Sequence, residues 1–482
     1  MTLRQQLFAV KSIRLLEEEL AGENRLRRVL GPVSLTALGV GAIIGAGIFV
    51  LTGLAAHNFA GPGLMLSFVV AGFGCALAAL CYAEFAAMVP VAGSAYAYAY
   101  ATLGELLAWI IGWDLILEYA VASSTVAHGW SHYFLSFLQL FGIALPTQIT
   151  NNPISQDAAH SWHWTGAYCN VPAAVIVLLI TVLLVVGIRE SARFNAAMVL
   201  LKLAVVLFVI AVGSFYVRVE NWHPFLPFGM SGVRRGAAYI FFAYIGFDSV
   251  STHAEEARNP QRDVPIGIIT SLALCTVLYI AVAAVLTGMV RYDQIDINAP
   301  VARAFEMRGL PIATLLISLG AVVGITSVLL VLLLSQARIL LAMARDGLIP
   351  RGFFGAVHPR FRTPHKATIL TGALVAIVAA LFPLEILAEL VNIGTLMAFV
   401  IVCAAVWIMR HTNPDVRRPF RTPFVPVVPL LGIAFNFELM TELGWENWAR
   451  LIVWLLIGMV IYFTYGRHHS VLADRRRRGQ AT

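Results

Sequence analysis

Long apolar stretches separated by short polar connections run through nearly the whole chain. A helix needs roughly 20 apolar residues to cross a bilayer, and about twelve stretches are long enough. These stretches predict transmembrane helices near 33–56, 62–88, 95–125, 171–189, 194–217, 234–256, 264–290, 312–340, 366–382, 385–410, 424–442 and 448–466. The pattern therefore predicts an all-α polytopic membrane protein.

Composition supports a single membrane domain. Of the residues, 59% are hydrophobic and 12% are charged, which is more apolar surface than a soluble core can bury. No long polar stretch is present that could form a second globular unit. We expect a transmembrane domain over 32–466, an amphipathic arm over 1–31 in place of a cleavable signal, and a basic tail over 467–482.

Positive charge is concentrated in particular connections. The net charge of +7 could indicate nucleic-acid binding, but the loop 338–366 and the tail Arg475 to Arg478 hold much of it. If both termini are cytoplasmic, most Lys and Arg fall on the inner side, as the positive-inside rule requires. We expect a cell membrane protein, in a bacterial inner membrane, whose inner face meets anionic lipids, with no nucleic-acid partner.

The longest connection on the outer side, about Val126 to Asn170, contains a further apolar segment. Trp130 to Leu145 is too short and too polar for a span, so we expect a short helix at the outer surface. If this segment crossed the bilayer, every later basic loop would change sides. The charge distribution argues against that topology.

Two predicted spans are interrupted in the same way. Gly39 to Phe49 reads GVGAIIGAGIF, and Phe241 to Val250 reads FFAYIGFDSV, with Gly246 beside Asp248. Free backbone groups at membrane depth are tolerated only where they line a cavity or are buried in protein. The breaks lie five helices apart, which predicts a 5+5 inverted repeat over 33–217 and 234–410 with extra helices over 424–466. Paired breaks indicate a transporter substrate site.

The chemistry of a broken helix suits a zwitterion. Free N–H groups at the second half-helix can hold a carboxylate, and free C=O groups at the first can hold an ammonium. The alternative is that the glycines serve close packing, since Gly41 and Gly45 fit a small-xxx-small spacing. A second break at the matching position, with an acid beside it, favours binding.

Several strings resemble one transporter family. They are GVGAIIGAGIFVLTG from Gly39, AGPG from Ala60, the segment Cys81 to Tyr119, FFAYIGFDSVSTHAEEARNPQRDVP from Phe241 and SQARILLAMARDGLIP from Ser335. In these the chain resembles the amino acid-polyamine-organocation (APC) superfamily, most closely the short bacterial form of its cationic amino acid transporter branch. The resemblance implies a LeuT-type fold with discontinuous helices 1 and 6 that carries L-amino acids by alternating access.

The resemblance also assigns the substrate site, with Phe242 as an aromatic gate. It implies cationic substrates such as arginine, lysine and ornithine, while bacterial relatives that carry alanine keep small neutral amino acids as an alternative. The implied substrate-binding residues are Ile43, Ile44, Gly45, Ala46 and Gly47 in helix 1, and Phe242, Ala243, Tyr244 and Ile245 in helix 6.

Lys202 lies inside the predicted fifth span, where charge is costly. It either extends to the inner face or, desolvated, exchanges between charged and neutral forms and couples a proton. By resemblance it matches the place where sodium-driven relatives bind a second sodium, which predicts proton symport or sodium-independent exchange. The resemblance pairs it with Glu118 of helix 3, and we expect Asp114 to accept a structural hydrogen bond.

Asp248 has two possible roles, and two hydroxyls are further candidates. The carboxylate could bind the distal charge of a cationic substrate or cap the second half of helix 6. Thr326 and Ser327 could line the coupling region. No metal-ligand, nucleophile or pore-filter motif is readable, so an enzyme or a channel is less favoured, and no cofactor is expected.

Overall fold

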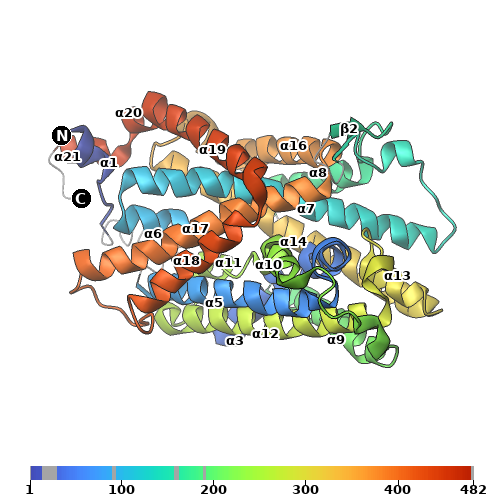
Figure 1. The fold of residues 1–482 in the computed structure, drawn as a ribbon. Helices are drawn as coiled ribbons and strands as arrows, with labels where there is room; N and C mark the ends of the chain where they lie inside the picture. Colours follow the sequence, from blue (N-terminus) through green and yellow to red (C-terminus); the bar gives the residue numbers. More distant parts are fainter. Residues whose placement is uncertain (1, 13–29, 89–93, 157–161, 188–191, 479–482) are drawn as a thin grey trace.

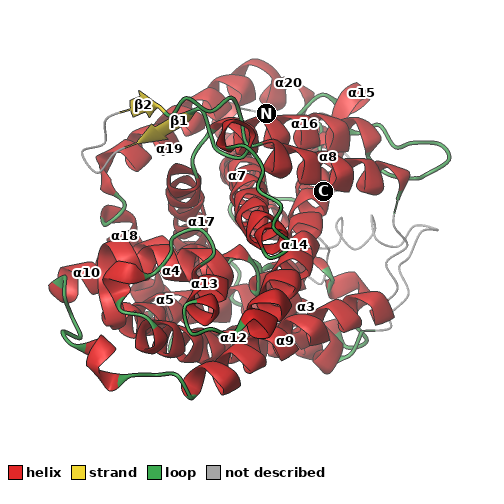
Figure 2. Cartoon of the chain, turned by 90° about the vertical axis from the view of Figure 1, so that its right-hand side faces the viewer, coloured by secondary structure: helices red, strands yellow, loops and turns green. Residues whose placement is uncertain are grey.

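The computed structural model describes residues 2–12, 30–88, 94–156, 162–187 and 192–478. Helices make up most of this part of the chain (Figures 1 and 2). Most of the predicted amphipathic arm, residues 13–29, lies outside the described residues. The predicted all-α polytopic fold is confirmed, because each predicted apolar stretch coincides with a helix or a broken helix.

Seven helical segments of the described chain are long and apolar enough to cross a membrane. The long helices are α5 (Leu64–Met88), α7 (Glu105–Gln139), α9 (Ala192–Ser214), α12 (Pro260–Met289), α14 (Pro311–Arg345), α17 (Leu384–Thr412) and α19 (Gly444–Ile461). Shorter apolar helices are α3 (Pro32–Ile43), α8 (Val171–Val186), α16 (His365–Leu381) and α18 (Val427–Thr441). The number of bilayer crossings stays a prediction.

Five helices form two closely packed groups in the bundle. The long helices α7 and α14 pack along each other, and α12 packs against both α5 and α3. Figure 2 looks nearly along α7 and α14, with α3 and α12 beside them. Close approach depends on glycine, since a Cβ on Gly320 of α14 would lie 2.4 Å from a methyl group of Val205 in α9.

Both termini lie at the same end of the bundle, at the left of Figure 1. There α1 (Leu3–Leu7) and α21 (Val471–Arg477) are tied together by Arg476, which donates to the Val10 carbonyl at 2.8 Å. Lys11 forms an ion pair with Asp346 at 2.8 Å, just after α14. The opposite end carries α13 (Pro300–Glu306) and the antiparallel hairpin of β1 (Ile154–Gln156) and β2 (Trp162–Trp164).

A buried ion cluster joins the connection that follows α17 to the C-terminal end of α5. Arg410 binds both oxygens of Glu84, at 2.8 and 2.9 Å, and Arg418 lies 3.3 Å from the same carboxylate. The backbone N–H of Thr422 also donates to Glu84, at 2.7 Å. Several donors compensate the buried charge, so the cluster is expected to be structural.

The prediction for residues 95–145 was wrong in two respects. Gly104, at φ 101°, separates α6 (Ser94–Thr102) from α7, and α7 continues without a break to Gln139. The polar residues that suggested a surface segment find partners inside the protein. Tyr133 donates to the Phe49 carbonyl at 2.7 Å, and Ser131 donates to Asn170 at 2.8 Å. With these groups satisfied, the helix can continue.

Candidate substrate site

The first helix break follows α3. The N–H of Ile44 still bonds to the Val40 carbonyl, but Ile44 has ψ 103°, which ends the helix. The chain resumes as a π-helical turn, Gly47–Leu51, after Gly45 and Ala46. Backbone groups are therefore released within the bundle, as the glycine run predicts.

The second break lies in helix 6. The helix α10 (Gly229–Ile240) passes into a 3-10 turn, Phe241–Tyr244, and the chain then extends at Ile245. Gly246 has φ 113°, which favours glycine, and a Cβ there would lie 2.9 Å from the Ala42 carbonyl oxygen. The chain returns to helix at α11 (Ser249–Thr252).

The two breaks face each other. A Cβ on Gly47 would lie 2.4 Å from the Cα atom of Ala243, so the two backbones are in direct contact. Tyr279 of α12 joins them from behind, because its hydroxyl lies 2.9 Å from the Ile43 carbonyl oxygen and 3.0 Å from that of Ala243. Tyr279 was not predicted as a site residue, because its only signal in the sequence is a hydroxyl inside an apolar span.

A cavity of about 10 Å³ lies between the breaks. That volume holds about one water molecule, so an amino acid can enter only if the surrounding helices separate. Six of the predicted substrate-binding residues line it: Ile43, Gly45, Ala46, Gly47, Phe242 and Ile245. The lining does not include Ile44, Ala243, Tyr244 or Asp248.

The other predicted residues have identifiable contacts. Tyr244 points toward α5, where its hydroxyl donates to the Phe68 carbonyl at 2.7 Å. The rest of the cavity lining was not predicted and comes from α7, α14 and the end of α3. These residues are Ala42, Ala122, Val126, Val328 and Leu332. The two residues from α7 are four positions apart, as are the two from α14, and this spacing places each pair on one face of its helix.

Lys202 is buried on α9 and bonds to the first broken helix. Its ammonium donates to the carbonyl of Gly41 at 2.5 Å. In a continuous helix that carbonyl would accept from the N–H of Gly45, which lies beyond the break. The side chain packs on Gly324 of α14, with Cys275 of α12 close enough to interact electrostatically.

The expected pairing of Lys202 with Glu118 is wrong. Among the described residues no ion pair joins them, because α9 packs against α3, α12 and α14, whereas Glu118 lies on α7 facing α17. Glu118 is buried beside Thr395 and within electrostatic reach of Asp248 and Asp114. Both oxygens of Asp114 lack a hydrogen-bond partner in the described chain, so the expected structural hydrogen bond is also absent.

Asp248 contacts α7. It accepts a hydrogen bond from the Tyr119 hydroxyl at 3.1 Å. It precedes α11, yet its side chain makes no capping hydrogen bond there, so the capping alternative is not realised. The hydroxyls of Thr326 and Ser327 bond within α14, to Val322 at 2.7 Å and to Gly324 at 3.0 Å.

Comparison with known proteins identifies the family. The family model described as "Amino acid permease" matches residues 30–465, nearly the whole chain. The chain belongs to the amino acid permease family. It is therefore a member of the APC superfamily, as its motifs predicted, and a transporter family member rather than an enzyme.

Named relatives of this permease differ in substrate. It is 51% identical to the "Branched-chain amino acid permease BcaP" of Bacillus subtilis (strain 168), over 98% of this chain and 100% of the relative. It is 48% identical to the "Methylthioribose transporter" of the same organism, over 97% of this chain and 99% of that relative. It is 32% identical to the "Cationic amino acid transporter 4, vacuolar" of Arabidopsis thaliana, over 96% of this chain and 95% of that relative. These matches and the apolar helices identify a multi-pass membrane protein.

Proposed function

We propose that this permease is a secondary active transporter that carries an L-amino acid between the two helix breaks. The observation that supports this most directly is the contact of the breaks around one small cavity. Released N–H groups of the second half-helices suit the α-carboxylate, and released carbonyls of the first halves suit the α-ammonium. Phe242, which lines the cavity, would close over the substrate.

We propose further that the preferred substrate has an uncharged, apolar side chain. The cavity is lined by aliphatic and small residues and by Phe242, with no charged side chain among them. An apolar wall favours an aliphatic substrate and penalises a desolvated cation. Asp248, the expected ligand of a cationic substrate, is instead bonded to Tyr119. The name of the branched-chain relative agrees with this preference.

The proposed coupling ion is the proton. The ammonium of Lys202 binds a carbonyl released by the helix-1 break, so its protonation state acts on the same backbone that holds the substrate. A fixed cation at this place also disfavours sodium there. Glu118 is buried near Asp248, and no ion pair joins it to a cation within the described residues, so it is a second candidate carrier of the proton.

Counterflow into proteoliposomes tests the substrate class. The assay uses labelled leucine, with unlabelled leucine, alanine, arginine or methylthioribose trapped inside. We expect leucine to drive the largest exchange, alanine less, and arginine and methylthioribose little. Exchange driven mainly by arginine would restore the cationic preference that the family resemblance implied. No uptake of labelled leucine with any of the trapped amino acids would contradict amino acid transport.

A further inference from the structure

The end of the bundle that carries α13, at the right of Figure 1, has buried N–H groups without a protein acceptor. The indole nitrogen of Trp222 and the Nε atom of Arg308 are both buried, and neither has a hydrogen-bond partner among the described residues. Native proteins leave few buried polar groups unpaired, so each such group needs an explanation. A ligand that accepts hydrogen bonds from both would supply one.

Both groups meet at the last turn of α12. Another nitrogen of the Arg308 guanidinium donates to the carbonyl of Met289, the last residue of that helix. A Cβ on Gly288 would lie 3.3 Å from the Cζ2 atom of Trp222, which is two bonds from the indole nitrogen. The backbone N–H of Arg218 donates to the Gly288 carbonyl at 2.9 Å and fixes the segment that carries the indole. Adjacent residues of one turn therefore hold the two side chains.

The local charge is positive. Burial lowers the pKa of the Arg308 guanidinium, and the positive charge of Arg218 nearby lowers it further. Neither arginine forms an ion pair within the part of the chain that the structure describes. Of the acids nearest in sequence, Glu220 is exposed, and Glu306 is paired with Arg303 at 2.6 Å. Two guanidinium groups beside an indole N–H suit an anion with several acceptor oxygens.

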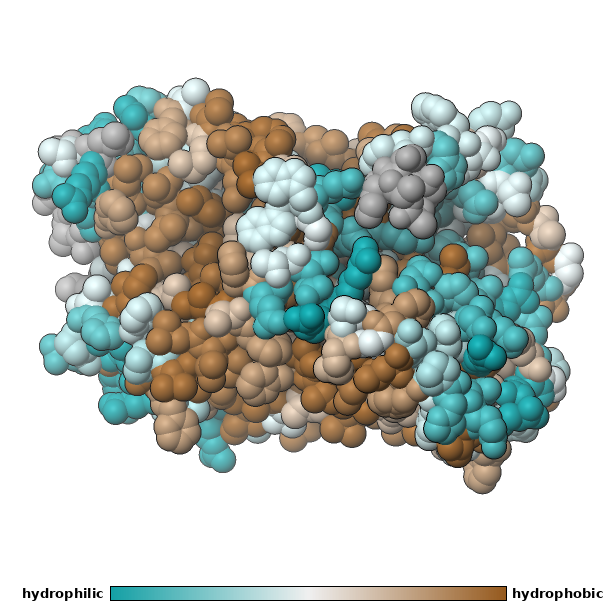
Figure 3. Space-filling view, in the orientation of Figure 1, coloured by the Kyte–Doolittle hydropathy of each residue, from teal (hydrophilic) through white to brown (hydrophobic). Residues whose placement is uncertain are grey.

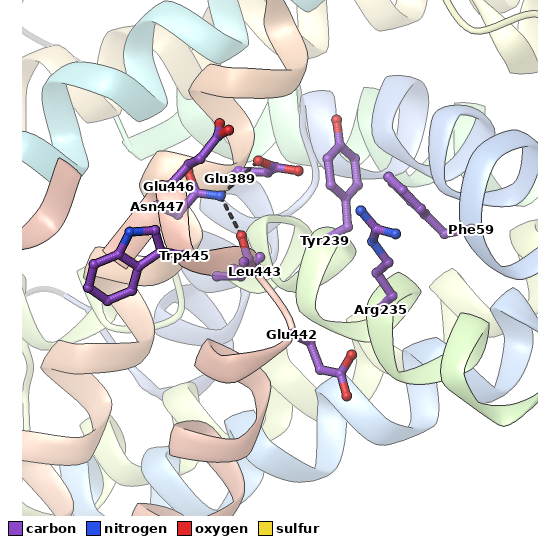
Figure 4. Close-up of a pocket in the computed structure, with 10 residues that line it drawn as sticks. Phe59, Arg235, Tyr239, Glu389, Glu442, Leu443, Trp445, Glu446 and Asn447 are labelled. Carbon is purple, nitrogen blue, oxygen red and sulfur yellow. Dashed lines mark hydrogen bonds between the residues drawn. The ribbon is translucent and has the colours of Figure 1, made fainter. Parts of the chain in front are cut away.

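A pocket of about 340 Å³ between α10 and the connection from α18 to α19 has the opposite character (Figure 4). There Arg235 shares the walls with three carboxylates, those of Glu389, Glu442 and Glu446. Like charges repel, so an anion is disfavoured in that pocket. The turn at the end of α12 is the better place for one, because its arginines are not balanced by acids in the described chain.

The surroundings of this turn suit a phospholipid. Figure 3 shows hydrophobic side chains over much of the middle of the bundle and hydrophilic ones at the end that carries α13. Exposed apolar residues next to the two arginines in sequence are Phe215, Val219, Met307 and Ile312. Tryptophan is enriched at the level of lipid headgroups. Acyl chains can therefore lie against the apolar residues while the headgroup reaches the arginines.

We propose that Arg218, Arg308 and the indole N–H of Trp222 bind a phosphate group at this end of the bundle. The Nε–H of Arg308 and the indole N–H each donate to a phosphate oxygen, and Arg218 supplies a second positive charge. The apolar residues beside the site make a phospholipid headgroup the expected source of the phosphate, and free phosphate is the other source. The site is separate from the substrate cavity, with which it shares no residue.

Native mass spectrometry of the purified permease tests the lipid source. The protein is equilibrated with equal amounts of phosphatidylglycerol and of a galactolipid that has no phosphate, and the retained lipids are counted. The wild type should retain one phosphatidylglycerol more than Arg308→Gln or Trp222→Phe, whereas galactolipid retention should be the same in all three proteins. Equal retention of phosphatidylglycerol in the three proteins would exclude the lipid source.

Thermal unfolding in detergent without lipid tests the free anion. Inorganic phosphate is compared with chloride at equal ionic strength. A Tm that phosphate raises in the wild type, but not in Arg308→Gln or Trp222→Phe, would support the site with free phosphate as a ligand. Equal lipid retention together with no phosphate-specific rise in Tm would overturn the proposal.

Matched variants make both results specific. Trp222→Phe keeps an aromatic ring and removes an N–H that has no partner in the described chain, so the variant should fold with a nearly unchanged Tm. Arg308→Lys keeps the positive charge and should keep part of the binding. Trp164→Phe, at an exposed tryptophan of β2, and Arg450→Gln, where Glu446 lies 3.3 Å away, should change neither readout. An equal loss of binding in these two controls would also overturn the proposal.

Discussion

The Nζ atom of Lys202 lies 2.5 Å from the carbonyl oxygen of Gly41. The bond joins a buried ionisable group to a carbonyl that the helix-1 break leaves without its usual N–H partner. A change in the charge of Lys202 therefore alters the backbone at the substrate site directly. We propose this contact, in place of the expected ion pair with Glu118, as the basis for coupling.

Lys202→Met should separate transport from its driving force. One unit of pH gradient corresponds to about 1.4 kcal/mol, or tenfold in accumulation. The wild type should accumulate leucine about tenfold further per unit, whereas the variant should exchange leucine without responding to the gradient. Lys366→Met, on an exposed lysine, is the matched control. A variant that still accumulates leucine with the pH gradient would rule out the assignment.

Gly47→Ala should force the two broken helices apart. The new Cβ would lie 2.4 Å from the Cα atom of Ala243, a backbone atom that cannot turn away. Overpacking of this kind costs about 1–3 kcal/mol. We expect a lower Tm and a several-fold slower initial uptake, measured on the same preparation. Gly352→Ala, where no atom lies within 4 Å, should change neither, and equal effects of the two variants would contradict the contact.

Val328→Ala should shift the preference toward larger side chains. Val328 and Leu332 form the α14 wall of the cavity, and removal of two methyl groups enlarges it. A methylene in an apolar pocket is worth about 1–3 kcal/mol, so the ratio of leucine to alanine uptake should rise about tenfold or more. Val427→Ala, on an exposed valine of α18, is the control. An unchanged ratio would mean that the substrate side chain lies elsewhere.

Glu84→Gln should lower stability. Both carboxylate oxygens of Glu84 accept hydrogen bonds from Arg410, and Arg418 lies close to the same carboxylate. Breaking a buried ion pair costs about 3–5 kcal/mol because the remaining charge loses its compensation. The Tm in detergent should fall clearly, while Glu306→Gln, at an exposed pair, should shift it little, since such pairs contribute about 0–1 kcal/mol. Similar shifts for both would indicate that the cluster is not structural.

Local features of the chain were sufficient to predict most of the helices and both breaks. Apolar length predicts a span by itself, and glycines at matching places predict where backbone groups are released. The family resemblance had implied six of the cavity residues, and they lie at the breaks because the break and the cavity wall are the same segment of chain. Gly41 and Gly45 also pack closely, against Val199 and Val328, so the packing alternative describes the same residues correctly.

What could not be predicted depends on which helices face each other. Helical spacing places Asp114 and Glu118 on one face of α7, but it does not say that α17 covers that face and that α9 lies elsewhere. The length of α7 was missed for a similar reason, since Tyr133 and Ser131 are satisfied by residues distant in sequence. The contact of Tyr279 with both breaks depends on the packing of α12 against them, which the sequence alone does not give.

Proton movement driven by substrate is the most direct test of the central claim. Proteoliposomes that contain a trapped pH-sensitive dye are given leucine outside, with no sodium present and no imposed ion gradient. The account predicts that the lumen acidifies as leucine enters, and that Lys202→Met abolishes the acidification while leucine counterflow continues. Leucine uptake that requires sodium and leaves the lumen pH unchanged would contradict it.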